Sequence, residues 1–119
     1  MGNRAVIAFH GTGGKSPCVY VHWNGGRASV EGFLRAAKRL DIEPSMEEFH
    51  RLVGGFLGSS AYLEPFDRAD KNNGDNGVYF ISHEWDIVSR EHQPRCEEPD
   101  FEKTHDIAVD CIAEYLIWT

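Results

Sequence analysis

The sequence predicts one compact α+β domain, with an antiparallel sheet of four or five strands and three helices in the order β-β-α-α-β-β-α. Short runs of β-branched and aromatic residues alternate with glycine- and proline-rich turns, and three other segments carry apolar residues at helical spacing. The chain has 119 residues, of which 41% are hydrophobic and 26% are charged. One core therefore accounts for residues 1–119, and no second domain is expected.

The first two strands are expected at residues 4–9 (RAVIAF) and 18–23 (CVYVHW), which are rich in β-branched and aromatic residues. The segment between them, HGTGGKSP, has the composition of a turn, so the two strands should form a hairpin with a long loop. The loop ends like a phosphate-binding P-loop. However, Phe9 stands where that motif requires glycine, and a strand rather than a helix is predicted after Pro17. We therefore interpret the segment as a hairpin loop.

Two helices should follow the hairpin. The first is predicted over residues 28–40 with Ser29 as its N-cap, because apolar residues recur there at helical spacing. The second is predicted over residues 45–57, where Ser45 and Glu48 match the S-x-x-E capping box. In that motif each side chain bonds the free backbone N–H of the other residue, so the start of the second helix is well defined.

The next segments are expected to complete the sheet. Residues 60–66 are interpreted as a short edge strand, because Pro65 lacks a backbone donor. The strand at residues 4–9 is the alternative open edge. Residues 78–81 and 84–88 should form one bent strand or two short strands.

The last helix is predicted over residues 101–117, where two faces of different chemistry repeat at helical spacing. One face carries apolar residues that should pack on the core, namely Ile107, Ala108, Cys111, Ile112, Tyr115 and Leu116. The other face carries carboxylates about 6 Å apart, namely Asp106, Asp110 and Glu114. This helix should therefore bury Cys111 and expose its acidic residues.

The negative charge of the chain is concentrated near its end. The net charge is −7 at pH 7. Residues 1–80 contain nine acidic and nine basic residues, whereas residues 81–119 contain ten acidic and three basic residues. Such a surface repels nucleic acids and acidic membranes and favours a basic partner. We expect no direct binding to either, and an acidic surface that serves only solubility is the alternative.

The segment from His22 to Arg27 is the best candidate for a ligand site. Two glycines follow the end of a strand there and precede a helix N-terminus, with an arginine beside them. Such a turn can hold an anionic or nucleotide-like group, with Trp23 as a stacking surface. The ligand-binding candidates are His22, Trp23, Asn24, Gly25 and Arg27. The alternative is an ordinary strand-to-helix turn with Trp23 in the core and Arg27 in solvent.

The spacing of cysteines and histidines does not favour a metal site or catalysis. Cys18, Cys96 and Cys111 are odd in number and irregularly spaced, which is typical of a reduced intracellular protein. The sequence has no C-x-x-C or H-x-x-x-H pair, and no Ser or Cys in a nucleophile elbow. We expect no cofactor, no metal and a cytoplasmic location, and we favour a non-enzymatic protein while catalysis stays open. Cys111 should be buried, Cys18 partly covered and Cys96 accessible.

The N-terminal third resembles small uncharacterised proteins of phages and mobile elements. The resemblance rests on GNRAVI in the first strand, VYVHWNGG in the second strand and the helix that follows, and it covers residues 2–40. Small acidic inhibitors of host defence systems are frequent among such proteins. The resemblance therefore implies an accessory gene of a virus or plasmid.

Two functional hypotheses follow. The first is a small, acidic, non-enzymatic inhibitor that binds a basic host defence protein, for example a nucleic-acid-binding one, in the host cytoplasm. It would act through its acidic C-terminal third, with Asp106, Asp110 and Glu114 as the partner-binding residues. The second is a protein that binds or hydrolyses a small anionic, nucleotide-like ligand at the turn from His22 to Arg27.

Overall fold

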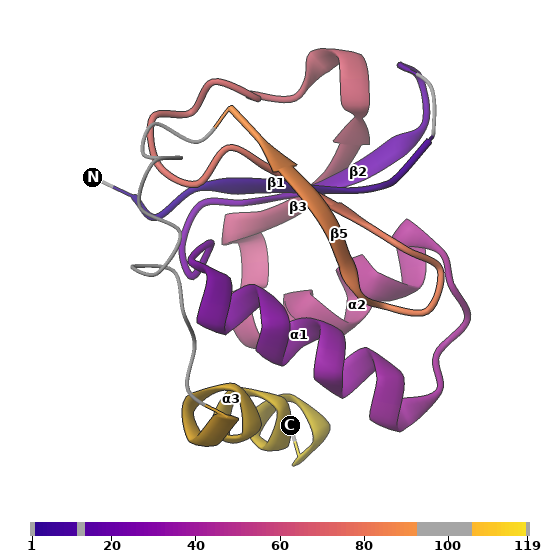
Figure 1. The fold of residues 1–119 in the computed structure, drawn as a ribbon, viewed down its shortest axis with the longest axis vertical. Coiled ribbons are helices and arrows are strands. Elements are labelled where there is room, and N and C mark those ends of the chain that lie inside the picture. Colours follow the sequence, from indigo (N-terminus) through magenta and orange to yellow (C-terminus); the bar gives the residue numbers. More distant parts are fainter. Residues whose placement is uncertain (1, 12–13, 93–105, 119) are drawn as a thin grey trace.

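Five strands form one mixed sheet in the order β3-β2-β1-β4-β5, and three α-helices lie on one side of it (Figure 1). The computed structural model describes residues 2–11, 14–92 and 106–118. Within these ranges, no helix combines the length and the apolar character needed to cross a membrane. The predicted α+β class and the predicted order of strands and helices are confirmed. The elements are β1 (Ala5–Phe9), β2 (Pro17–Val21), α1 (Arg27–Leu40), α2 (Met46–Leu57), η1 (Gly58–Ser60), β3 (Ala61–Pro65), η2 (Phe66–Arg68), β4 (Val78–Ile81), β5 (Ile87–Glu91) and α3 (Asp106–Trp118).

The first predicted strand lies at the centre of the sheet. β1 pairs with β2 on one side and with β4 on the other, and each of its residues is at most 7% exposed. Both faces of the sheet are covered at this strand, which explains its continuous apolar run AVIAF. Of the two expected open edges, residues 60–66 are confirmed by β3. Residues 4–9 are wrong as an edge, because a strand lies on each side of them.

One strand pair departs from the predicted antiparallel sheet. β1 and β4 are parallel, with Val6 opposite Val78, whereas the other three pairs are antiparallel. The reason is the connection after β3. Residues 66–77 cross the face of the sheet opposite the helices and bring the chain to the far side of β1 (Figure 1). β4 therefore runs in the same direction as β3 and β1.

Each face of the sheet has its own apolar cluster. Helices α1 and α2 cover one face, where Phe33 and Phe49 are fully buried against the strands. The segment after β3 covers the other face, where Phe66 packs near Cys18. The buried side chain of Asn73 holds this segment in place through hydrogen bonds to its backbone. Both faces are thus covered by packing at the central strands, and the accessible surface lies at the edges of the sheet and on the helices.

The helix boundaries confirm one predicted cap and correct the other. α2 begins after Ser45, whose Oγ accepts a hydrogen bond from the Glu48 N–H at 3.1 Å. The Glu48 carboxylate binds Arg51 rather than the Ser45 N–H, so only half of the predicted capping box forms. The predicted N-cap Ser29 is wrong, because the N-cap of α1 is Gly26 and Ser29 lies inside the helix.

β4 and β5 confirm the predicted alternative of two short strands, and a tight turn at residues 82–86 separates them. β5 begins at Ile87, so the residues before it are not part of the strand expected at 84–88. Trp85 has a φ of 69°, in the left-handed region that bulky residues rarely adopt. Burial holds it there, since Trp85 is 5% exposed and its ring stacks on Phe49 with 5.5 Å between the ring centroids. The turn thereby directs a tryptophan under the helices.

Candidate functional site

The predicted ligand turn brings His22 and Trp23 together at the end of β2. Their rings meet edge to face with 5.0 Å between centroids, and the Tyr20 hydroxyl shares a hydrogen bond with His22 Nδ1 at 3.1 Å. Trp23 is 47% exposed, so it is not the core residue that the alternative interpretation required. The indole ring is therefore accessible to solvent.

The other residues of this turn make packing contacts within the protein. A Cβ on Gly25 would lie 2.5 Å from the Asn3 carbonyl oxygen, so glycine is needed where the chain before β1 passes. The Gly25 carbonyl accepts a hydrogen bond from the Tyr79 hydroxyl at 2.8 Å. The Asn24 amide donates to the Ser29 hydroxyl at 3.3 Å. Close chain packing therefore explains the glycine, and the turn holds Asn24 at a positive φ of 59°, which asparagine tolerates better than most residues.

Arg27 does not join His22 and Trp23. Its Nε donates a hydrogen bond to Glu31 Oε2 at 2.6 Å, one turn further along α1. Its side chain lines a groove to which His22 and Trp23 do not contribute. The five residues predicted to bind a ligand are thus divided between two parts of the surface.

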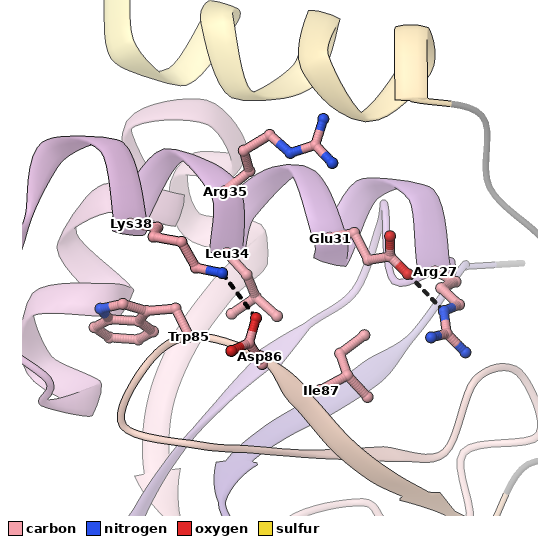
Figure 2. Close-up of a pocket in the computed structure, with 8 residues that line it drawn as sticks. All are labelled: Arg27, Glu31, Leu34, Arg35, Lys38, Trp85, Asp86 and Ile87. Atoms are coloured by element: carbon pink, nitrogen blue, oxygen red, sulfur yellow. Dashed lines mark hydrogen bonds and ion pairs between the residues drawn. The ribbon is translucent and has the colours of Figure 1, made fainter.

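The groove lies between α1 and the start of β5 and has a volume of about 310 Å³ (Figure 2). The apolar part of its lining consists of Leu34, Trp85 and Ile87, and the first two are at most 5% exposed. The charged part of its lining consists of Arg27, Glu31, Arg35, Lys38 and Asp86. Five of its eight lining residues are thus charged, whereas pockets for small molecules are usually lined mostly by apolar side chains. We call this surface the α1–β5 groove.

Two ion pairs occupy the α1–β5 groove. Lys38 Nζ lies 2.7 Å from Asp86 Oδ1, and Arg27 Nε lies 2.6 Å from Glu31 Oε2 (Figure 2). All four side chains contact solvent, with exposed fractions from 26% to 63%. Exposed ion pairs contribute roughly 0–1 kcal/mol. Each of these two pairs therefore adds little to the stability of the fold.

Arg27 is the one residue of this groove that was predicted from the sequence to bind a ligand. A usable signal was present on α1, because four charged residues recur at helical spacing and so share one side of the helix. They are Arg27, Glu31, Arg35 and Lys38. The opposite wall had no such signal, since Trp85 and Asp86 reach the groove only through the turn before β5.

Two of the acidic residues predicted to bind a partner lie against α1. Asp110 Oδ1 is 2.6 Å from Arg39 and 3.2 Å from Arg35, and Glu114 Oε2 is 3.1 Å from Arg39. Hydrogen bonds from Arg39 and then Arg35 hold the pKa of Asp110 below its usual value. Both carboxylates are about half exposed and can still face a partner with part of their charge offset. The side chain of Asp106 lies outside the described part of the chain.

The predicted buried face of the last helix is wrong. The helix is rotated about its axis relative to the prediction, so different side chains pack inward. Of the residues expected to be buried, those that pack inward are Ile112 and Leu116. Those that are exposed instead are Ile107, Ala108, Cys111 and Tyr115. Val109 and Ala113 take their place and are at most 1% exposed. The part of the prediction that falls on residues 101–105 lies outside the described ranges.

Two features of α1 explain this rotation. Gly32 has no side chain, and a Cβ there would lie 2.5 Å from Ile112 Cγ2 and 3.2 Å from the Val109 carbonyl oxygen. α3 therefore approaches α1 most closely at this glycine. Arg35 and Arg39 bind the α3 carboxylates beside the same contact. Because α3 has apolar residues on several sides, helical spacing alone did not decide which side packs.

The rotation leaves an apolar ridge on the outside of α3. Ile107 is 79% exposed, Tyr115 is 56% exposed and Trp118 is 81% exposed, and Cys111 is exposed between them. Ile107, Cys111 and Tyr115 are spaced four residues apart, which places them on one side of the helix. We call Ile107, Cys111, Tyr115 and Trp118 the α3 ridge. Two carboxylates of α3 flank the same shallow surface.

The cysteines correct part of the predicted pattern of reactivity. Cys111 is exposed on the α3 ridge rather than buried, because of the rotation of α3. Cys18 is fully buried under the segment that follows β3. Burial raises the pKa of the Cys18 thiol to about 12. Cys96, the expected accessible thiol, lies outside the described residues.

Timed thiol labelling tests this difference between the two cysteines. We expect maleimide to modify Cys111 in the native protein and Cys18 only after denaturation, because the thiolate is the reactive form and Cys18 is both covered and protonated. Mass spectrometry of peptides assigns each modified cysteine. A Cys111→Ser variant is the control for the rapid site. Labelling of Cys18 at the rate of Cys111 would contradict the described packing.

The glycine-rich loop and His83 have structural explanations. β2 follows the loop directly, so no helix N-terminus lies there to bind a phosphate. His83 stacks on Phe9 with 4.3 Å between ring centroids and an interplanar angle of 3°. Among the residues that the structure describes, no three His, Cys, Asp or Glu side chains are placed to hold a metal ion.

No protein-family model, no curated protein and no solved structure matches this chain. Within the described ranges, the α3 ridge and the α1–β5 groove differ in their chemistry. The α3 ridge exposes large apolar side chains, whereas the groove carries charged side chains above an apolar floor.

Proposed function

We propose that this protein is a small non-enzymatic binding protein whose α3 ridge docks into an apolar groove on another protein. The observation that carries the proposal is the exposure of Ile107, Tyr115 and Trp118 on one side of a single helix. Large apolar side chains gathered in one exposed patch are typical of interaction sites, whereas isolated ones are ordinary. A helix that presents such residues suits helix-in-groove recognition.

The charge around the α3 ridge favours a partner with basic residues beside its apolar groove. α3 carries three acidic residues and no basic ones, and the whole protein has a net charge of −7. Arg35 and Arg39 offset part of this charge. The remaining field would steer a basic partner toward the ridge. A second copy of the chain would bring like charges together, so we favour a different protein.

Inhibition of a host protein is the biological role that we attach to this proposal. The resemblance of residues 2–40 to small proteins of phages and mobile elements supports such a role. An acidic surface also suits a basic partner that normally binds nucleic acid. Occupation of the partner's surface is enough for inhibition, so no catalysis by this protein is required.

Trp118 and Tyr115 should supply most of the binding energy. An aromatic side chain buries roughly 150–250 Å² in a packed contact. Truncation of a central aromatic at an interface typically costs roughly 2 kcal/mol or more. For Trp118→Ala we therefore expect binding about 30-fold weaker than that of the wild type.

The experiment uses a purified partner. Immobilised protein retains candidate partners from the source-cell extract, and each is identified by mass spectrometry and then purified. Kd is measured for the wild type, Trp118→Ala, Tyr115→Ala and Tyr62→Ala. Tyr62 is the matched control because it is 47% exposed on β3. Circular dichroism checks that each variant is folded.

Support requires weaker binding by both α3 variants, unchanged binding by Tyr62→Ala and weaker binding at higher salt, since salt screens exposed charges. Equal affinities would show that another surface binds the partner. Self-association that Trp118→Ala abolishes would identify a second copy as the occupant and refute a different partner. The proposal also fails if no protein binds the wild type better than it binds Trp118→Ala.

A further inference from the structure

We propose that the outer edge of β3 binds an extended basic segment of a partner protein, whose arginines lie against the ring of Tyr62 and the carboxylate of Glu64. β3 ends the sheet on one side, because among the described strands it pairs only with β2. We call Tyr62, Leu63, Glu64 and Asp70 the β3 edge surface. It is separate from the α3 ridge, so the inference goes beyond the function proposed above and does not depend on it.

Tyr62 offers an accessible aromatic ring that the sheet supports. The residue is 47% exposed, and its ring centroid lies 5.0 Å from that of Tyr20. Tyr20 is 7% exposed, and its hydroxyl shares a hydrogen bond with His22 Nδ1 at 3.1 Å. Because the face of an aromatic ring attracts a guanidinium or ammonium group, Tyr62 favours a cationic ligand.

The charges beside Tyr62 are negative. Burial raises the pKa of the Tyr62 hydroxyl, and the charges of Glu64 and Asp70 raise it further, so both carboxylates lie near this ring. Neither carboxylate forms an ion pair with a basic side chain in the part of the chain that the structure describes. A cation can therefore approach the β3 edge surface without the loss of an existing ion pair.

Lys71 is a basic residue close enough to act on Glu64, and its own contacts are elsewhere. Its Nζ donates a hydrogen bond to the Phe66 carbonyl oxygen at 2.8 Å and lies 4.7 Å from the centroid of the Phe66 ring. Burial and then the charge of Asp70 raise the pKa of Glu64, whereas Lys71 lowers it by a smaller amount. Lys71 thus offsets only part of the negative charge of the two carboxylates.

The backbone of β3 leaves Leu63 open to a new strand. In an antiparallel pair, alternate residues exchange hydrogen bonds with the neighbouring strand. Phe66 N–H donates to the Ser16 carbonyl oxygen at 2.9 Å. Tyr62 and Glu64 are four and two residues before Phe66, so their backbone groups face β2 as well. Leu63 lies between them, and its N–H and C=O therefore point to the outer edge.

The positions on either side of Leu63 are closed to a partner strand. The Ala61 carbonyl accepts a hydrogen bond from His50 Nε2 at 3.2 Å, and Pro65 has no N–H to donate. A partner strand can therefore pair with β3 in one register, in which one of its residues lies opposite Leu63. This register fixes which partner side chains reach the β3 edge surface.

The register sets the sequence of the bound segment. Side chains alternate along a strand, so the residues before and after the one opposite Leu63 point to the side of Tyr62 and Glu64. These two should be arginines, because a guanidinium group can both stack on a ring and bind a carboxylate. Leu63 packs against the core on the helix side, so the residue opposite it should be apolar. The inferred segment is therefore arginine-apolar-arginine in an extended conformation.

The position and charge of the β3 edge surface argue against other occupants. A second copy of β3 would bring further carboxylates to this edge, and the phosphates of a nucleic acid would be repelled as well. Tyr62 pairs with Tyr20, which belongs to the sheet face opposite the helices. The α3 ridge lies in the helix layer (Figure 1), so a protein seated on the ridge does not reach Tyr62.

Binding of a fluorescein-labelled heptapeptide tests the inference. The probe has arginine at positions 3 and 5 and valine at position 4, with glycine, serine and threonine elsewhere. The control peptide has the same composition with the two arginines adjacent, so that they point to opposite faces of a strand. Fluorescence anisotropy should show that the probe binds the wild type about tenfold more tightly than the control peptide does.

Charge reversal on β3 locates the binding site. Glu64→Lys should weaken binding of the probe about tenfold, because an attraction becomes a repulsion. A probe with glutamate in place of both arginines should bind Glu64→Lys more tightly than it binds the wild type. The matched control is Glu84→Lys, since Glu84 is an exposed carboxylate between β4 and β5, at the opposite edge of the sheet.

The ring of Tyr62 is tested separately from its apolar area. Tyr62→Leu should weaken binding of the probe about threefold, because leucine has no ring face for a cation. Tyr62→Phe should bind the probe like the wild type. Trp118→Ala should also bind it like the wild type, and Tyr62→Leu should keep its affinity for a partner of the α3 ridge. The two proposals can therefore fail independently.

Chemical-shift changes on addition of the probe should map to residues 61–65 and to Tyr20, and the Leu63 amide should exchange more slowly in the complex. The inference is overturned if the probe and the control peptide bind equally, or if neither binds at about 1 mM. It is also overturned if Glu84→Lys weakens binding as much as Glu64→Lys, because binding would then depend only on overall charge. Unchanged exchange at Leu63 would refute strand pairing, and shift changes confined to α3 would refute a site on β3.

Discussion

Phe49→Ala should lower the free energy of unfolding by about 3–5 kcal/mol. Phe49 is fully buried on the inner side of α2, where its ring stacks on Trp85 at 5.5 Å and an interplanar angle of 23°. Its removal leaves a cavity that the closely packed neighbours fill only in part. The loss is a large fraction of the roughly 5–15 kcal/mol by which most domains are stable.

The same substitution should also alter the α1–β5 groove. Trp85 forms part of the groove floor, and packing of its ring holds its backbone at a positive φ. Urea unfolding followed by circular dichroism gives the free energy of unfolding. Phe56→Ala is the control, because Phe56 is only partly buried at the margin of the core and should lose less. A loss below about 1 kcal/mol for Phe49→Ala would contradict the described core.

Local chemistry predicted most of the secondary structure. The runs RAVIAF and CVYVHW became β1 and β2 because β-branched and aromatic side chains favour strands. Ser45 caps α2 because its hydroxyl needs only a backbone N–H three residues away. Such contacts lie within a few residues of each other, so a sequence pattern can reveal them.

The arrangement of the strands depends on a longer connection. Residues 66–77 have the composition of a loop, and nothing in that composition shows which face of the sheet they cross. Their path places β4 beside β1 and makes the pair parallel. The central position of β1 follows from the same path. Its unbroken apolar run was the available signal, because a strand covered on both faces lacks alternation.

The ligand site at the turn from His22 to Arg27 was predicted from residues that instead make contacts within the protein. Gly25 suggested room for a ligand, but the space beside it is filled by the chain at Asn3. Arg27 belongs to α1 and pairs with Glu31 in the groove, so it is separated from Trp23. Both facts involve contacts between segments, which residue types in one short window do not reveal.

The sequence of α1 indicates which face of α3 packs against it, and the spacing of apolar residues in α3 does not contain this information. Gly32 lies inside a helix, where a glycine costs about 1 kcal/mol relative to alanine. Such a residue is typical of a close approach by another segment. Arg35 and Arg39 are four residues apart, as are Asp110 and Glu114, and this common spacing matches the three ion pairs across the helix contact. Together these patterns favour the observed face.

Gly32→Val should therefore displace α3 and lower the free energy of unfolding by about 1–3 kcal/mol. A Cβ at position 32 would lie 2.5 Å from Ile112 Cγ2 and 2.6 Å from Ile112 Cβ, so α3 has to move away. Val109 and Ala113 would then lose contact with α1. A separate helix as short as α3 is marginally stable in water, so the α3 ridge should lose its order and its affinity for a partner.

Hydrogen exchange and urea unfolding check this expectation, with Gly54→Val as the matched control. Gly54 lies inside α2, and a Cβ there meets no atom within 4 Å. The same substitution at Gly54 should change stability by less than about 0.5 kcal/mol, because valine and glycine differ little in helix propensity. Gly32→Val should speed amide exchange within α3 while α2 keeps its protection. Equal stabilities of the two variants, with unchanged exchange in α3, would show that α3 does not pack on Gly32.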